Sequence, residues 1–178
     1  GLVNKPMYAV PNHMLGQFTK EFYEQYPSAR IMVADETRFH TDRRKQFISD
    51  VANNDIDAVI LTHSAFGLLP ISPKFEAGMV EEQISDYREL LADLPKDSEN
   101  RITRSRVEKQ VEQLEQRLKA LGNRKKDNVY TFEETGIDFM FVDEAHLFRK
   151  LAFTTKMAQV KGIDPDGSQA SFDLYSKI

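Results

Sequence analysis

The first third of the chain alternates short apolar runs with helical patterns. Runs rich in aliphatic residues occupy residues 7–10, 30–34 and 57–62, as expected of strands that are covered on both faces of a sheet. Between these runs, apolar positions recur at steps of three and four, which is typical of amphipathic helices. Those positions are Leu15, Phe18, Phe22 and Tyr26 in the first helix, and Phe47, Ile48 and Val51 in the second. Strands that alternate with helices predict an α/β fold with a parallel sheet and right-handed crossovers.

A heptad pattern replaces this alternation in the middle of the chain. Two apolar seams, each about two heptads long, are separated by the short polar link "PKDSEN". The seam residues are Val80, Ile84, Tyr87, Leu91 and Leu94, and then Val107, Val111, Leu114, Leu118 and Leu121. A short link favours two antiparallel helices. Residues 70–127 are therefore expected to form a helical hairpin, inserted into an α/β domain made of residues 1–69 and 128–178.

Opposite charges mark the two predicted hairpin helices. The first carries mainly Asp and Glu on its polar positions, whereas the second is rich in Arg and Lys and is followed by "NRKK" at 123–126. One interpretation is that these charges solvate the hairpin and set its register. The alternative is that the basic helix lies along a nucleic-acid phosphate backbone. Such a hairpin also offers a surface for a protein partner.

A fourth apolar run leads directly into acidic residues. In "GIDFMFVDEAHLFRKL" (136–151), a predicted buried strand at 138–142 ends at Asp143 and Glu144, and His146 follows. Open α/β sheets bind their ligands at the carboxyl ends of strands. An Asp at this point suits a hydrated magnesium ion, and a neighbouring Glu suits the removal of a proton from an attacking water. The structural alternative is that Asp143 caps the following turn and that His146 packs beneath it.

Composition narrows the function classes. The 178 residues carry a formal net charge of −4 and include no Cys, which excludes disulfides and thiolate metal sites and fits a cytoplasmic protein. No apolar run reaches the roughly 20 residues of a membrane span, so no membrane partner is expected. A metal hydrolase built on the histidines is disfavoured, because they show no H-x-x-x-H spacing. The four histidines are His13, His40, His63 and His146.

Three segments resemble motifs of superfamily-two helicases and translocases, and they occur in the family order. "FMFVDEAHLFRKL" (139–151) looks like motif II, the Walker B box, of the DEAH type. Residues 7–34 are similar to motif Ia of the chromatin-remodeller (Snf) branch, in which an apolar strand meets a Pro and a helix and another strand follow. "DAVILTHSAFGLL" (57–69) resembles the next strand and its Thr-containing loop, motif Ib.

This resemblance implies a RecA-like α/β domain of the P-loop NTPase type. Such a domain uses ATP and Mg²⁺ and acts on DNA, here duplex DNA, together with a second RecA-like domain. By the same likeness, Asp143 holds the magnesium ion through water, Glu144 is the catalytic base, and His146 couples the phosphate side to another element. The loops that face nucleic acid in the family correspond to Pro11, Asn12, His13, Thr62 and His63.

The chain also departs from the family. It contains no G-x-x-x-x-G-K-[ST] phosphate loop, because none of its eight glycines is followed by Lys. We therefore interpret it as part of the first motor domain of a longer protein, and we expect the chain alone to be inactive. The helical insertion resembles coiled insertions in large phage- and plasmid-borne helicase-like proteins, some fused to DNA methyltransferase domains. The rival interpretation is a non-catalytic helical module that docks a protein partner.

Overall fold

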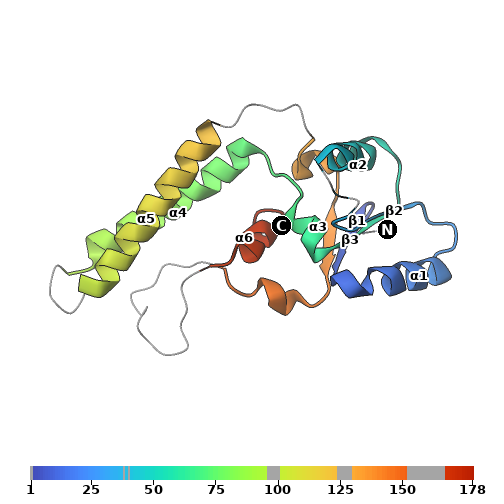
Figure 1. Cartoon of the computed structure of the whole chain (residues 1–178), viewed down its shortest axis with the longest axis horizontal. Coiled ribbons are helices and arrows are strands. Elements are labelled where there is room, and N and C mark those ends of the chain that lie inside the picture. The colour runs from blue at the N-terminus through green and yellow to red at the C-terminus, as the bar shows by residue number, and fades with distance from the viewer. Residues whose placement is uncertain (1, 38, 40, 96–100, 124–129, 152–166) are drawn as a thin grey trace. The chain divides into compact units, whose positions relative to one another are not determined.

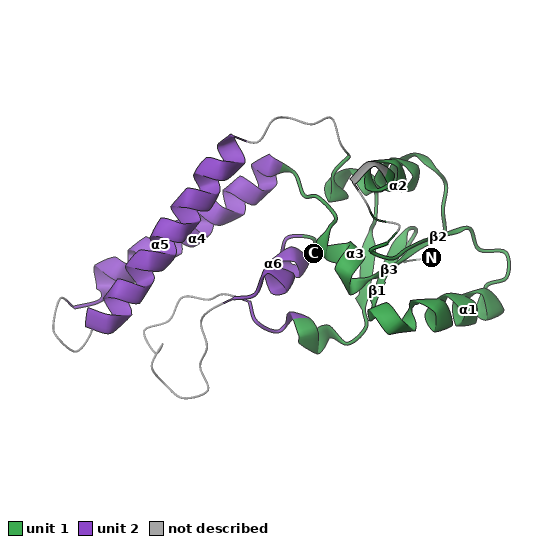
Figure 2. Cartoon of the chain, in the orientation of Figure 1, with its two compact units in different colours: residues 1–72, 127–147, 177–178 green, residues 73–126, 148–176 purple. Residues whose placement is uncertain are grey.

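The computed structural model describes residues 2–37, 39, 41–95, 101–123, 130–151 and 167–178. The chain divides into two compact units, which are coloured separately in Figure 2. The first unit comprises residues 1–72, 127–147 and 177–178, and the second comprises residues 73–126 and 148–176. No helix among the described residues is long and apolar enough to cross a membrane.

A parallel sheet of four strands organises the first unit. The strand order is β2-β3-β1-β4, and every pair of neighbours is parallel. The strands are β1 (Pro6–Val10), β2 (Ile31–Ala34), β3 (Ala58–Thr62) and β4 (Phe139–Val142). This parallel sheet with its flanking helices confirms the predicted α/β fold. The arrangement is consistent with part of a RecA-like domain.

Two helices connect the first three strands, and they lie on opposite sides of the sheet (Figure 1). Helix α1 (Leu15–Gln25) leads from β1 to β2, and α2 (Thr41–Asn53) leads back from β2 to β3. The two crossovers run in opposite directions across the sheet, so right-handed connections place their helices on opposite faces. Tyr8 of β1 marks the α1 face, where its ring contacts the rings of Phe18 and Phe22.

Burial is deepest in β3 and falls off at β4. Residues 58–61 of β3 are fully buried, because β3 has a neighbouring strand on each side. Strand β4 pairs with β1 alone among the described strands. Phe139 and Phe141 are therefore 49% and 45% exposed, although the Phe141 ring stacks on Tyr8 at 4.8 Å between centroids. The prediction that this run forms a buried strand was wrong, since Met140 and Val142 on the other face are only partly buried, and burial depends on neighbours that the local pattern does not reveal.

Short helical turns follow the strands of the first unit. The 3-10 turn η1 (Asn12–Met14) follows β1, and helix α3 (His63–Gly67) begins where β3 ends. Two further turns, η2 (Phe132–Thr135) and η3 (Ala145–Phe148), lie before and after β4. The first, third and fourth strands thus each run into a turn or helix at their carboxyl ends.

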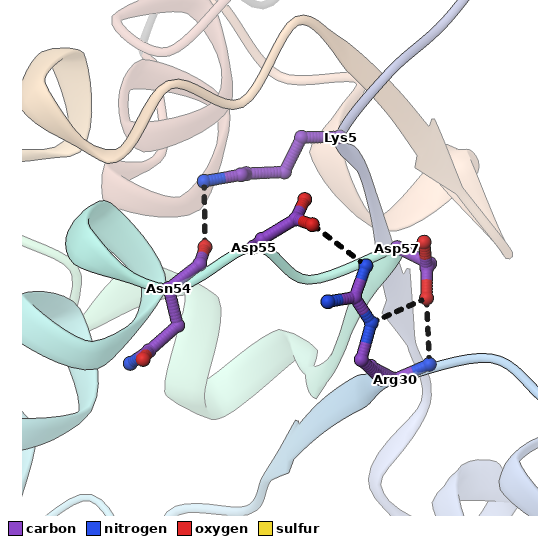
Figure 3. A network of polar contacts seen from close by, with 5 residues as sticks. All are labelled: Lys5, Arg30, Asn54, Asp55 and Asp57. Atoms are coloured by element: carbon purple, nitrogen blue, oxygen red, sulfur yellow. Dashed lines mark hydrogen bonds and ion pairs between the residues drawn. The ribbon is translucent and has the colours of Figure 1, made fainter.

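Charged side chains tie together the amino ends of the strands (Figure 3). Arg30, just before β2, donates from Nη2 to Asp55 Oδ2 at 2.9 Å, and its backbone N–H donates to Asp57 Oδ2 at 2.7 Å. Lys5 Nζ donates to the carbonyl oxygens of Val51 and Asn54, at 2.8 and 3.5 Å. A cation at this position compensates the carbonyl groups at the end of α2. This network stabilises the amino edge of the sheet, away from the carboxyl edge.

Asp138 gives the amino edge a pH dependence. Its carboxylate accepts hydrogen bonds from the backbone N–H groups of Asn4 and Lys5, at 2.7 and 2.9 Å, and these bonds lower its pKa below the ordinary value of 3.8. A carboxyl with a depressed folded-state pKa stabilises the fold above its ordinary pKa, and this stabilisation is lost as the pH falls through the folded-state value. We expect Asp138→Asn to lower the thermal midpoint by roughly 3 °C at neutral pH.

The difference in thermal midpoint between wild type and Asp138→Asn should become smaller as the pH is lowered. Below the folded-state pKa, the wild-type carboxyl is protonated and resembles the amide that replaces it. Thermal melts of both proteins, at neutral pH and at several pH values below 3.8, measure the difference between their thermal midpoints. A difference of equal size at every pH would show that the charge of Asp138 contributes nothing to stability.

Two long helices form the main part of the second unit. Helices α4 (Pro73–Asp93) and α5 (Arg101–Gly122) pack antiparallel, as expected, and the link at 96–100 lies outside the described residues. Their buried residues form two apolar clusters, one around Tyr87, Leu90 and Val107 and one around Val80 and Leu121. Leu90 is more deeply buried than Leu91, which the heptad spacing had placed in the seam.

An ion pair joins the two helices of the second unit and also contacts a third. Arg117 of α5 donates to Glu76 Oε1 from both Nε and Nη2, at 3.2 and 2.8 Å. Its guanidinium also lies 4.2 Å from the ring centroid of Phe172 in α6 (Gln169–Tyr175). At this point, a basic residue of α5 therefore pairs with an acidic residue of α4. Such pairing is expected if the charges of the hairpin set its register.

Candidate functional site

Three turns meet at the carboxyl edge of the sheet. Val10 of β1 is paired with Thr62 of β3, and Ala9 is paired with Val142 of β4. One residue beyond β4, the Asp143 N–H still donates to the Ala9 carbonyl at 2.9 Å. The loop after β1, the start of α3 and the acidic turn after β4 therefore lie side by side, with β1 in the centre. Ligands of open α/β sheets bind at this edge.

The acidic turn has an unusual backbone. Asp143 and Glu144 are both exposed, and Glu144 has a φ of +50°, in the left-handed region. This conformation costs a non-glycine residue about 1 kcal/mol. Asp143 Oδ1 accepts the Glu144 N–H at 2.9 Å and so helps to hold the turn. The Asp143 side chain is thus bonded to the next backbone N–H of its own turn, and its position at a strand end still allows it to bind a ligand.

His146 reaches back to Glu144. Its Nδ1 lies 2.9 Å from Glu144 Oε2, and the two side chains are 60% and 53% exposed. His146 is therefore not packed beneath the turn, as the structural alternative required. The contact orients the Glu144 carboxylate and leaves it open to solvent over half of its surface. A carboxylate in this position can accept a proton from a water molecule.

His63 connects the second turn to the acidic one. Its Nε2 lies 3.0 Å from the backbone carbonyl oxygen of Asp143, across 80 residues of sequence. The next residue, Ser64, exchanges two hydrogen bonds with the Asn12 side chain, of 2.8 and 3.2 Å. Sequence reasoning missed Ser64. Its position directly after the predicted motif Ib Thr-His pair was the available signal.

The five predicted nucleic-acid-facing residues are placed differently from one another. Asn12 and His13 are exposed in η1, and His63 is half-buried. Pro11 is buried, and Thr62 is only 2% exposed. The Thr62 hydroxyl caps α3 by accepting the Ala65 N–H at 3.2 Å. The structure thus brings Asn12 and His63 to one surface and turns Thr62 inward.

A magnesium ion would find one carboxylate ligand in the acidic turn. Among the described residues, no group of three or more His, Asp or Glu side chains is arranged to hold a metal by itself. Mg²⁺ at phosphate-transfer sites is usually held by one or two carboxylates together with phosphate oxygens and water. The exposed Asp143, with one oxygen engaged by its own turn, fits such a role as a single ligand.

A hollow of about 410 Å³ lies beside Asn12 at the same edge of the sheet. It is lined by the first turns of α1, including Leu15 and Gly16, and by Asp35 after β2. The Asp35 carboxylate disfavours a phosphate inside the hollow. A nucleic-acid phosphate is therefore better accommodated on the exposed side of Asn12 and His13 than in the hollow.

Comparison with known protein families identifies the chain. The model of a family described as "probable helicase domain" matches residues 1–178. No curated protein matches the chain. No solved structure matches it.

Proposed function

The chain belongs to the family of probable helicase domains, and from this premise we propose that it is part of the motor domain of an ATP-dependent DNA helicase or translocase. Membership of the family indicates an enzyme of the helicase type that interacts with nucleic acid. The observation that supports the finer proposal is the D-E-A-H turn at the carboxyl edge, where His63 and the Asn12–Ser64 pair lie beside it.

In this proposal, Glu144 is the general base. Its half-exposed carboxylate accepts the proton of the water that attacks the terminal phosphate of ATP. His146 holds Oε2 of that carboxylate at 2.9 Å and so reduces the orientations open to it. Asp143, whose Oδ1 accepts the Glu144 N–H, would hold Mg²⁺ through a water molecule. When bound, Mg²⁺ supplies positive charge that offsets the charge on the phosphates.

The nucleic-acid surface is proposed to lie over the turn after β1 and the start of α3. The exposed side chains of Asn12 and His13 supply hydrogen-bond donors for phosphate oxygens. Thr62 and Pro11 act indirectly, because Thr62 caps α3 and Pro11 is buried. The resemblance of residues 7–34 to the Snf-type motif Ia favours duplex DNA over RNA.

The ATP phosphates need further groups that these 178 residues do not contain. The sequence has no G-x-x-x-x-G-K-[ST] loop to surround the phosphates with backbone N–H groups. We propose that this loop and a second RecA-like domain belong to the same longer protein. The 178-residue chain by itself is then expected to bind ATP weakly and not to turn it over. Calorimetry with ATP and Mg²⁺ tests this point.

Nucleic-acid-stimulated ATP hydrolysis by the full-length protein tests the proposed function. We expect duplex DNA to raise the hydrolysis rate about tenfold or more, which corresponds to about 1.4 kcal/mol of activation free energy. Single-stranded DNA and RNA of matched length are the comparisons that define the substrate class. If no nucleic acid changes the rate and no hydrolysis is seen, the motor proposal fails, and the rival interpretation of a helical module that docks a protein partner gains support.

A further inference from the structure

We propose that His63 is a positioning residue, which carries the effect of nucleic-acid binding at the turn after β1 to the acidic turn after β4. This inference rests on the proposed function and concerns the regulation of the same site. It gives His63 a different role from the direct nucleic-acid contact that the sequence resemblance implies. The role follows from two sets of contacts, one on each side of His63.

The first contact is with the peptide group that joins Asp143 to Glu144. A carbonyl oxygen can only accept a hydrogen bond. In the 3.0 Å contact, His63 Nε2 therefore carries a hydrogen and donates a hydrogen bond to the Asp143 carbonyl oxygen. The N–H end of the same peptide group donates to Asp143 Oδ1 at 2.9 Å. Both ends of this peptide group are thus held. Its orientation sets the backbone angle of Glu144, whose φ is +50°.

The second set of contacts joins His63 to the turn after β1. Ser64, the neighbour of His63 in the first turn of α3, exchanges hydrogen bonds with the exposed Asn12 side chain. Three features hold helix α3 in place. Thr62 caps it at one end, Phe66 is fully buried, and Lys177 Nζ donates to the Phe66 carbonyl at 3.2 Å.

These contacts form a continuous route between the two functions. A phosphate that binds the Asn12 side chain competes for the hydrogen bonds between Asn12 and Ser64. Because the Thr62 cap and the buried Phe66 hold α3 in place, the change falls on its two partly exposed first residues, His63 and Ser64. His63 then shifts the peptide group that orients Glu144. A small displacement of a catalytic group is enough to change a rate by about a hundredfold.

Direct contact and positioning predict different kinetics. If His63 binds phosphate directly, its removal raises the DNA concentration that gives half-maximal stimulation. If His63 positions the acidic turn, its removal lowers the maximal rate at saturating DNA. The Gln side chain places an amide N–H at nearly the same distance from the backbone as His Nε2. The Asn side chain is one carbon shorter and does not reach that position.

The experiment measures ATP hydrolysis by the full-length protein as duplex DNA is titrated at saturating ATP. We expect His63→Ala and His63→Asn to lower the maximal DNA-stimulated rate about tenfold, with a change of less than about threefold in the half-saturating DNA concentration. His63→Gln is expected to retain most of the wild-type maximum. Lys20→Ala, on the exposed surface of α1, is the control and should behave as wild type does.

Each outcome decides between the accounts. A maximal rate that is unchanged in His63→Ala overturns the inference. An increase in the half-saturating DNA concentration without a fall in the maximal rate overturns it as well. Equal losses in His63→Gln and His63→Asn overturn it as well, because the N–H donor would then be irrelevant. If DNA does not stimulate the wild-type protein, the proposed function itself has failed. That result is seen before any variant is made.

Discussion

Replacing Glu144 with Gln in the full-length protein is expected to lower ATP hydrolysis about a hundredfold or more, which is the effect of removing a positioned general base. Gln has nearly the same shape as Glu but cannot accept a proton at neutral pH. It can also keep a contact with His146 Nδ1, which lies 2.9 Å from the present carboxylate. The turn around the positive φ of residue 144 should therefore stay intact.

Nucleotide binding should survive this change, because Asp143 and the rest of the turn remain. Hydrolysis is measured by steady-state phosphate release, and binding is measured by calorimetry or by a fluorescent nucleotide analogue. Glu21→Gln is the matched control, since Glu21 is an exposed acid on α1 that is bonded to Gln17. Turnover that is unchanged in Glu144→Gln would remove Glu144 from the role of base. A parallel loss of nucleotide affinity would instead indicate that Glu144 helps to bind the Mg²⁺ that accompanies ATP.

The placement of the acidic residues at the sheet edge could be predicted from the sequence, because it depends on local patterns. Apolar runs that alternate with helical periodicity indicated a parallel sheet, and such sheets bring the carboxyl ends of their strands together. Asp143 and Glu144 follow the last run directly, so their location at that edge followed from counting residues. Asn12 and His63, in contrast, were assigned to nucleic-acid-facing loops only by the resemblance to motifs Ia and Ib.

The contacts between these turns could not be predicted, because they depend on strand order. His63 meets the Asp143 carbonyl because β1 lies between β3 and β4, and no local pattern specifies that order. The inward turn of Thr62 depends on the first residues of α3, where its hydroxyl finds the Ala65 N–H. The exposure of Phe139 and Phe141 likewise reflects which neighbours β4 has, rather than its own composition.

The hairpin was predictable for a different reason. Its core is built from residues that are close in sequence and repeat with the period of the helix, so the seam could be read without knowledge of the sheet. The register still required the structure, because Leu90 is buried whereas Leu91 is only partly buried against the same cluster. Among the described residues, both apolar clusters of the second unit draw all of their members from α4, α5 and the residue that follows α4. This composition leads to an expectation about stability.

Replacing Val80 with Asp is expected to open the hairpin and to leave the sheet folded. Val80 is fully buried beside Ile84 and Leu121, and a buried charge without a partner costs about 4 kcal/mol or more. That cost falls on the apolar cluster of α4 and α5. The sheet has its own buried residues in β3, including Ile60 and Leu61, which are fully buried.

Amide hydrogen exchange resolves the two units within one protein. In Val80→Asp, the amides of α4 and α5 should lose protection, whereas those of Ile60 and Leu61 should exchange as slowly as in wild type. Ser85→Asp adds the same charge at an exposed position of α4 and should leave both sets protected. Faster exchange in β3 together with α4 would mean that the hairpin and the sheet unfold as one cooperative body. The helices of 73–122 would then be part of the structural core rather than an insertion that the α/β domain can lose.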